Sequence, residues 1–128
     1  MRRGEIYWVD FDPTRGHEQS GTRPALIIQN DVGNQYSPTT VVAILTRTVP
    51  DPLYPFMVLV EPADSGLPDR GVVNCAQIRT ISTGPGSNRL LPPQAATEIR
   101  PIGRLGPTKM AEVDRAIHRS LGLNCPRQ

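Results

Sequence analysis

The chain has 128 residues, of which 38% are hydrophobic and 20% are charged, and its net charge is +2. These values fit one globular domain, and they exclude both a disordered chain and a protein that is basic over its whole surface. The longest aliphatic run, VVAIL at 41–45, is far shorter than the ~20 residues that span a bilayer. We therefore expect a soluble, cytoplasmic protein without a membrane segment.

The apolar runs of the chain predict about five short strands followed by one helix. In chain order, the strands are expected at 5–11, 25–30, 40–47, 56–61 and 72–81. The helix is expected to begin at Pro107, because proline suits the first helical turn, and to end before Gly122. This order predicts a mainly β fold, a small barrel with a C-terminal helix that closes one end.

Residues 1–123 are predicted to form the single domain, and residues 124–128 a tail. Within the domain, residues 83–102 are rich in proline and glycine and are expected to form an insertion or a mobile loop. The runs NDVGNQYSP and EPADSGLPDRG, which separate predicted strands, are interpreted as turns.

Neither the cysteines nor the acidic residues form a pattern typical of a metal site. Cys75 lies in an apolar run and is expected to be a small buried thiol, while Cys125 lies in the polar tail. Asp10 and Asp12 share one face of a predicted strand but lack a third ligand. We therefore expect no metal and no cofactor.

A polar, glycine-containing loop, residues 16–23, leads directly into the apolar residues 25–28. The guanidinium of Arg23 is planar and permanently charged, which suits the binding of phosphate oxygens. Glu18 can accept a proton if it is partly desolvated, and the intrinsic pKa of His17 suits acid–base chemistry. The alternative is a solvated loop in which Arg23 and Glu18 pair with each other.

Two further polar patterns lie on predicted strands. Thr46 ends an apolar strand and shares a face with Ile44, so its hydroxyl can hold a phosphate oxygen, or it can simply be a β-favouring residue at a strand end. Gln77 and Arg79 alternate with the apolar Ile78 and can contact RNA bases or phosphates. The same alternation also occurs on any half-solvated strand.

Taken together, GEIYWVDFDPTRGHEQSGTRPALIIQND, GNQYSPTTVVAILTRT and QIRTI resemble the MazF/PemK family of toxin endoribonucleases, the mRNA interferases of type II toxin–antitoxin systems. The resemblance covers residues 3–61, 70–82 and 103–123. It implies an SH3-like β-barrel of the CcdB/PemK toxin type that forms a homodimer. It also implies sequence-specific, metal-independent cleavage of single-stranded RNA, which leaves a 2′,3′-cyclic phosphate and a 5′-hydroxyl.

The resemblance also implies roles for particular residues. The catalytic arginine and threonine of the family correspond to Arg23 and Thr46, and Glu18 corresponds to a glutamate that takes part in proton transfer in some members. Arginine releases a proton only above pH ~12, so Glu18 suits the general base better than Arg23 does. The residues expected to contact RNA are His17, Gln19, Ser20, Gln77 and Arg79. His17 departs from the family, in which serine is frequent at this position.

A toxin of this family implies a cognate antitoxin, and a flexible acidic segment of that partner is expected to lie across the RNA groove. Two alternatives stay open from the sequence. One is a non-enzymatic toxin that binds gyrase, on the same barrel as the CcdB group. The other is an SH3-like module that binds RNA or protein without cleaving it.

Overall fold

The computed structural model describes residues 1–11 and 21–123. In chain order its elements are β1 (Glu5–Asp10), β2 (Thr22–Ile27), α1 (Asp31–Tyr36), β3 (Thr39–Thr46), β4 (Met57–Val60), α2 (Pro62–Ser65), β5 (Gly71–Ser82), β6 (Leu90–Leu91), β7 (Gly103–Arg104) and α3 (Pro107–Leu121). All of the strand pairs in these residues are antiparallel. No described helix is long and apolar enough to cross a membrane.

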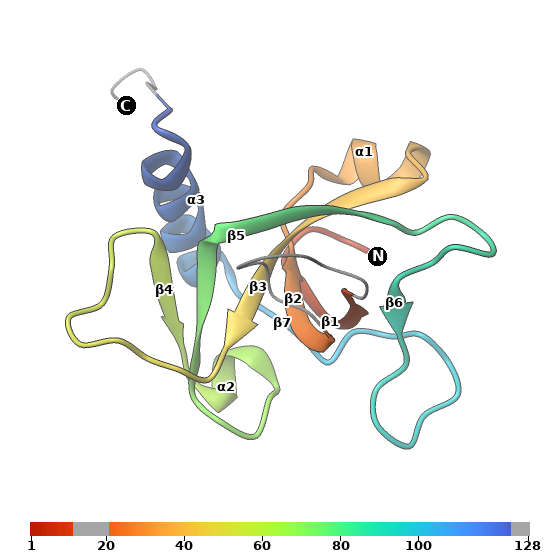
Figure 1. Cartoon of the computed structure of the whole chain (residues 1–128), viewed down its shortest axis with the longest axis horizontal. Coiled ribbons are helices and arrows are strands. Elements are labelled where there is room, and N and C mark those ends of the chain that lie inside the picture. The colour runs from red at the N-terminus through yellow and green to blue at the C-terminus, as the bar shows by residue number, and fades with distance from the viewer. Residues whose placement is uncertain (12–20, 124–128) are drawn as a thin grey trace.

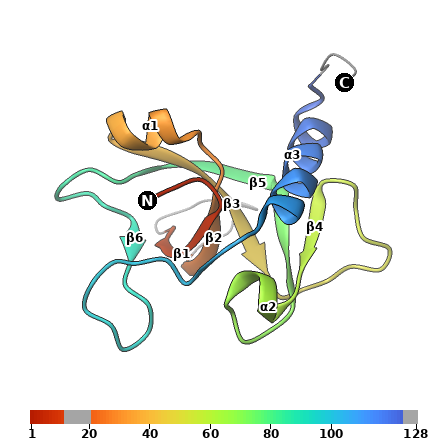
Figure 2. The same ribbon diagram turned by 180° about the vertical axis from the view of Figure 1, so that it is seen from behind.

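The strands form one curved sheet in the order β4-β5-β3-β2-β1-β6, and β7 also pairs with β1 (Figure 1). In the described residues, β4 and β6 are the two ends of this path, so the sheet is an antiparallel half-barrel. The C-terminal helix α3 packs beside β4 and β5, as the view from behind shows (Figure 2). This confirms the prediction of a mainly β fold with a C-terminal helix.

Strand β3 lies between β2 and β5 and has both faces buried. Val42 and Ile44 belong to one buried cluster, while Ala43 and Leu45 belong to another. Successive side chains of a strand point to opposite faces, so the aliphatic run inserts into both clusters at once. The predicted central position of this strand is confirmed.

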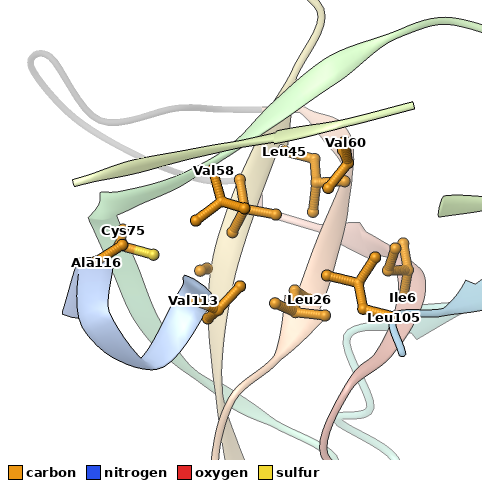
Figure 3. Close-up of a cluster of buried hydrophobic side chains, with 11 residues drawn as sticks. Ile6, Leu26, Leu45, Val58, Val60, Cys75, Leu105, Val113 and Ala116 are labelled. Atoms are coloured by element: carbon orange, nitrogen blue, oxygen red, sulfur yellow. The ribbon is translucent and has the colours of Figure 1, made fainter. Parts of the chain in front are cut away.

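The first cluster lies between the sheet and α3 (Figure 3). Val113 and Ala116 of the helix are buried there against side chains of the sheet that include Cys75 and Leu26. Cys75 is a free, buried thiol, as predicted. The helix begins at Pro107, and Gly122, in the left-handed region at φ 66°, follows its last residue as its C-cap. The second cluster covers the opposite face of the sheet.

Two segments interpreted as turns contain short helices. At α1, the side chain of Asn30 accepts a hydrogen bond from the backbone N–H of Gly33 and caps the helix. At α2, proline occupies the first helical position, and the Asp64 carboxylate accepts from the N–H of Glu61 at 2.8 Å. Both segments carry capping residues, but each is too short to contain a helical repeat of apolar residues. This is why the sequence predicts turns and not helices there.

Two strand predictions also need adjustment. The second strand spans Thr22–Ile27 rather than 25–30, because the polar residues before the apolar run already pair with β1. Within residues 83–102, the structure places β6, which pairs with β1 through Val9 and the buried Leu90. This segment therefore adds a short strand and one core side chain to the edge of the sheet.

Candidate active site

Arg23 and Thr46 meet at one end of the sheet. The last residue pair between β2 and β3 joins Ala25 to Ile44. Arg23 and Thr46 each lie two residues beyond this pair, on β2 and β3, and both line the same pocket. By the alternation of strands, Arg23 shares a face with Ala25, and Thr46 shares that face with Ile44. The structure thus brings together the two residues that the family resemblance assigns to catalysis.

The two residues line one pocket of about 340 Å³ at this end of the sheet. Its walls come from β1, the start of β2, the end of β3, and the connection from α2 to β5. The end of β3 lies beside α2 in Figure 1. Apolar side chains form part of the lining, among them Trp8, Leu45 and Leu67. This volume lies at the lower end of the range of small-ligand sites.

The charged residues that line the pocket are three arginines and one aspartate, Arg23, Arg47, Arg70 and Asp69. Arg47 forms an ion pair with Asp69 at 3.5 Å, and Arg70 pairs with Glu61 at 2.8 Å. Glu61 precedes α2, so the short helix holds the partner of one arginine in place. The excess of positive charge favours an anionic ligand such as a phosphate.

The hydroxyl of Thr46 retains a donor for a ligand. Its oxygen accepts a hydrogen bond from the backbone N–H of Thr48 at 3.3 Å. A hydroxyl has one donor and two acceptor positions, so the O–H itself can still donate. The backbone of β5 at Gly71 approaches the backbone of Thr46 closely. A β-carbon at position 71 would lie only 2.5 Å from the carbonyl oxygen of Thr46. Thr46 can therefore donate to a phosphate oxygen from a fixed position.

Arg79 lies on the same face of the sheet as Arg23 and Thr46 but outside the pocket. It is opposite Val42 on β3, and its guanidinium carbon is 5.2 Å from the centroid of the Phe11 ring. Gln77 lies where the pairing of β3 and β5 shifts register, between Ile78 and Asn74. Neither residue lines the pocket, so the structure does not bring these two predicted RNA contacts into it.

His17, Glu18, Gln19 and Ser20 lie outside the described residues, and so does Asp12. The described residues on either side of this segment are joined, because the N–H of Phe11 donates to the carbonyl oxygen of Gly21 at 3.0 Å. Gly21 in turn lies two residues before Arg23.

Within residues 1–11 and 21–123, no three His, Cys, Asp or Glu side chains form a group that could hold a metal ion. Asp10 instead pairs with Arg89 at 3.7 Å. His118 lies on α3, far along the chain from the pocket residues.

Three of the residues that line the pocket do not emerge from sequence reasoning. The sequence indicates Trp8 only as part of a strand, and Leu67 and Arg70 only as part of a turn. Trp8 lies in an apolar strand, and no residue near it along the chain indicates that it lines a pocket. Its neighbours come from segments that only the sheet brings together.

The described strands form an antiparallel half-barrel with a C-terminal helix, and comparisons with known proteins identify the family to which such a chain belongs. Residues 2–121 match the family model described as PemK-like, MazF-like toxin of type II toxin-antitoxin system. The chain therefore belongs to this family of toxins, whose enzyme class is endoribonuclease.

Individual relatives agree with the family match. The chain is 40% identical to Endoribonuclease MazF of Staphylococcus saprophyticus, over 99% of this chain and 96% of that protein. It is 39% identical to Endoribonuclease MazF of Staphylococcus epidermidis, over 97% and 93% of the two chains. Among solved structures, MazF from Deinococcus radiodurans superposes with a TM-score of 0.74 at 27% identity, over 96% of this chain and 97% of that one.

Proposed function

We propose that the chain is a sequence-specific endoribonuclease that cleaves single-stranded RNA without a metal ion. The observation that carries this proposal is that Arg23, near the start of β2, and Thr46, at the end of β3, line one pocket whose charged residues are mostly arginines. The permanently charged guanidinium of Arg23 and the hydroxyl donor of Thr46, at adjacent strand ends, form a binding site for a phosphate. A gyrase-binding surface does not require such a site, and a module that only binds RNA would leave the RNA intact in the cleavage test below.

In the proposed reaction, the ribose 2′-oxygen attacks the adjacent phosphorus and the bond from phosphorus to the 5′-oxygen breaks. The 2′-hydroxyl proton passes to a general base, and the leaving 5′-oxygen gains a proton. The products are a 2′,3′-cyclic phosphate and a 5′-hydroxyl. Negative charge builds up on the phosphoryl oxygens during the attack, and Arg23 and Thr46 stabilise it from fixed positions.

We assign the general base to Glu18, because arginine holds its proton up to pH ~12 and above. Glu18 belongs to the segment whose ends are joined at Phe11 and Gly21, close to Arg23. The proposed RNA contacts are His17, Gln19 and Ser20 of the same segment, with Gln77 and Arg79 of β5. Arg79 lies on the sheet face of Arg23 and Thr46, which supports its place in this group.

We further propose a cognate antitoxin and a homodimeric toxin. Solved relatives include an endoribonuclease in complex with its cognate antitoxin from a mycobacterial species, with a TM-score of 0.74 at 26% identity over 98% of this chain and 99% of that one. An acidic segment of the antitoxin would compete with RNA for the arginines at the pocket. Expression of the toxin alone should then arrest growth, and co-expression of the antitoxin should restore it.

The test is cleavage of a long single-stranded RNA in EDTA by the wild type, Arg23→Ala, Thr46→Val and Arg115→Ala. The last variant removes an exposed arginine of α3, away from the pocket, and serves as the control. We expect discrete fragments with 5′-hydroxyl ends from the wild type and the control, and a rate lower by about 10²–10³ from the other two. RNA that stays intact with all four folded proteins would contradict the proposal and favour a non-catalytic toxin.

A further inference from the structure

We propose that the pocket beside Arg23 and Thr46 binds a nucleobase next to the cleaved phosphate, and that Trp8 is the surface on which this base stacks. This inference rests on the proposed ribonuclease function and adds to it a determinant of sequence specificity.

The floor of the pocket is a cross-strand row of flat and apolar side chains. Trp8 of β1 pairs with Pro24 of β2. Pro24 and Leu45 each lie one residue beyond the last pair of β2 and β3, Ala25 with Ile44, so they share one face of the sheet. Trp8, Pro24 and Leu45 therefore belong to this face, and all of them line the pocket. Leu67, from the connection after α2, adds a further apolar side chain.

Trp8 is available to a ligand, because it is only half-buried while both of its neighbours in β1, Tyr7 and Val9, are buried. An aromatic side chain at the wall of an open pocket is the typical stacking partner of an unpaired RNA base. Stacking alone tolerates any base, so selectivity requires polar groups near the base edge. Asp69 and Arg70 line the same pocket and offer an acceptor and a donor.

The row that contains Trp8 is adjacent to the row that contains Arg23 and Thr46. Neighbouring residues of a strand alternate between the two faces, so Arg23 and Thr46 face the opposite side of the sheet from Pro24 and Leu45. All four residues line the pocket, because β2 and β3 have their ends there. A phosphate held at the strand ends therefore leaves its attached base beside the slot formed by Trp8, Pro24 and Leu45. This geometry couples the position of the base to the position of the reacting phosphorus.

The combination of charged and apolar lining residues favours RNA as the occupant, because one nucleotide carries both a phosphate and a flat base. The three arginines that line the pocket outnumber its one aspartate, and one of them is the arginine proposed to hold the phosphate. A single nucleotide supplies both the anion for this rim and the flat ring for the apolar floor. An apolar side chain of the antitoxin would use only the floor.

Trp8 is the single tryptophan of the chain, so tryptophan fluorescence reports on this pocket alone. The sequence that the wild type cleaves is mapped first. An RNA oligonucleotide of this sequence is then synthesised with a 2′-deoxyribose at the cleaved position, so that it binds but cannot be cut. Titration of the wild type with this oligonucleotide should quench or shift the fluorescence in a saturable way. The midpoint of this titration should agree with the dissociation constant measured independently, from the fluorescence anisotropy of an end-labelled oligonucleotide.

Variants then test the role of the ring in cleavage of RNA libraries that vary around the cut site. Trp8→Phe keeps an aromatic ring and should keep the base preference. Trp8→Ala should raise KM by about 5- to 150-fold, the range expected for the loss of one stacked base, and should relax the preference at one position beside the cut. Tyr36→Ala removes an exposed aromatic residue of α1, outside the pocket, and should change neither quantity.

The outcomes separate this inference from the proposed function. If the wild type cleaves RNA but saturating oligonucleotide leaves the fluorescence unchanged, the inference is overturned and the ribonuclease function stands. The same conclusion follows if folded Trp8→Ala keeps the full base preference. A response to an antitoxin peptide without a response to RNA would overturn it in favour of the antitoxin. If the wild type neither binds nor cleaves RNA, the proposed function itself fails.

Discussion

At the scale of single residues, the hydroxyl of Thr46 is the feature that most directly links the structure to the reaction. The hydroxyl accepts from the N–H of Thr48 and can still donate its own proton. We predict that Thr46→Ser, which keeps this arrangement, retains most of the cleavage rate. Thr46→Val, which keeps the shape but not the donor, should lower kcat by about 10²–10³. Equal rates for the two variants would remove the hydroxyl from the mechanism.

Also at this scale, the pKa values of two buried side chains, Cys75 and Tyr7, predict how the stability of the fold depends on pH. Burial raises the pKa of the Cys75 thiol from 9.0 to about 11, and burial with the nearby Glu5 carboxylate raises the pKa of Tyr7 to about 12. Both groups hold their proton more tightly in the folded chain than in the unfolded one. The free energy of unfolding should therefore fall as the pH rises above about 9, where the unfolded thiol ionises first.

Urea unfolding at a series of pH values measures this loss. The thiol alone should account for roughly 2 kcal/mol by about pH 10.5, since one pKa unit corresponds to about 1.4 kcal/mol. Cys75→Ala lowers stability at every pH by leaving a small cavity, but it should flatten the decline between pH ~9 and ~10. An unchanged slope in that variant would show that other groups cause the alkaline loss.

At the scale of elements, the contact between β3 and β5 positions Thr46, the threonine that we propose to be catalytic. A β-carbon on Gly71 would lie 2.5 Å from the carbonyl oxygen of Thr46, so Gly71→Ala must move one strand away from the other. We expect a loss of about 1–3 kcal/mol in stability, measured by urea unfolding, together with a lower kcat. Gly84→Ala is the matched control, because the nearest atom to its β-carbon is 3.7 Å away. Full activity in Gly71→Ala would show that the site tolerates movement of β3.

The elements also show how far the sequence can be interpreted. The strands with long apolar runs and α3 are predicted close to their observed bounds, because burial imposes a period of two or of 3.6 on their residues. The helices α1 and α2 and the strand β6 are not predicted. Each has between two and six residues, which is too short for a period to emerge. Local capping contacts and pairing with β1 decide these elements instead.

At the scale of the whole molecule, the low net charge and the local group of arginines predict how RNA binding depends on salt. Arg23 and Arg70 line the pocket, and Arg79 lies outside it, on the same face of the sheet as Arg23. If these three side chains each neutralise one phosphate, the logarithm of the association constant should fall by about 2 for each tenfold rise in salt. Titration of the uncleavable oligonucleotide at several KCl concentrations measures the slope.

Arg79→Gln should reduce this slope by about 0.7 without a large change in kcat, since Arg79 lies outside the pocket. Arg115→Ala, on the exposed side of α3, should leave the slope unchanged. Binding that does not vary with salt would contradict an electrostatic role for this group of arginines.

The sequence by itself determined the strands with long apolar runs, the C-terminal helix, the buried Cys75 and, through the motifs around Arg23 and Thr46, the toxin family. These features depend on residue types and on spacing along the chain, which a sequence displays directly. Only the tertiary structure decided that Arg23 and Thr46 line one pocket, that Trp8 lines it too, and that Arg79 lies outside it. Those relations depend on strand register, which arises from the pairing of segments far apart in the chain.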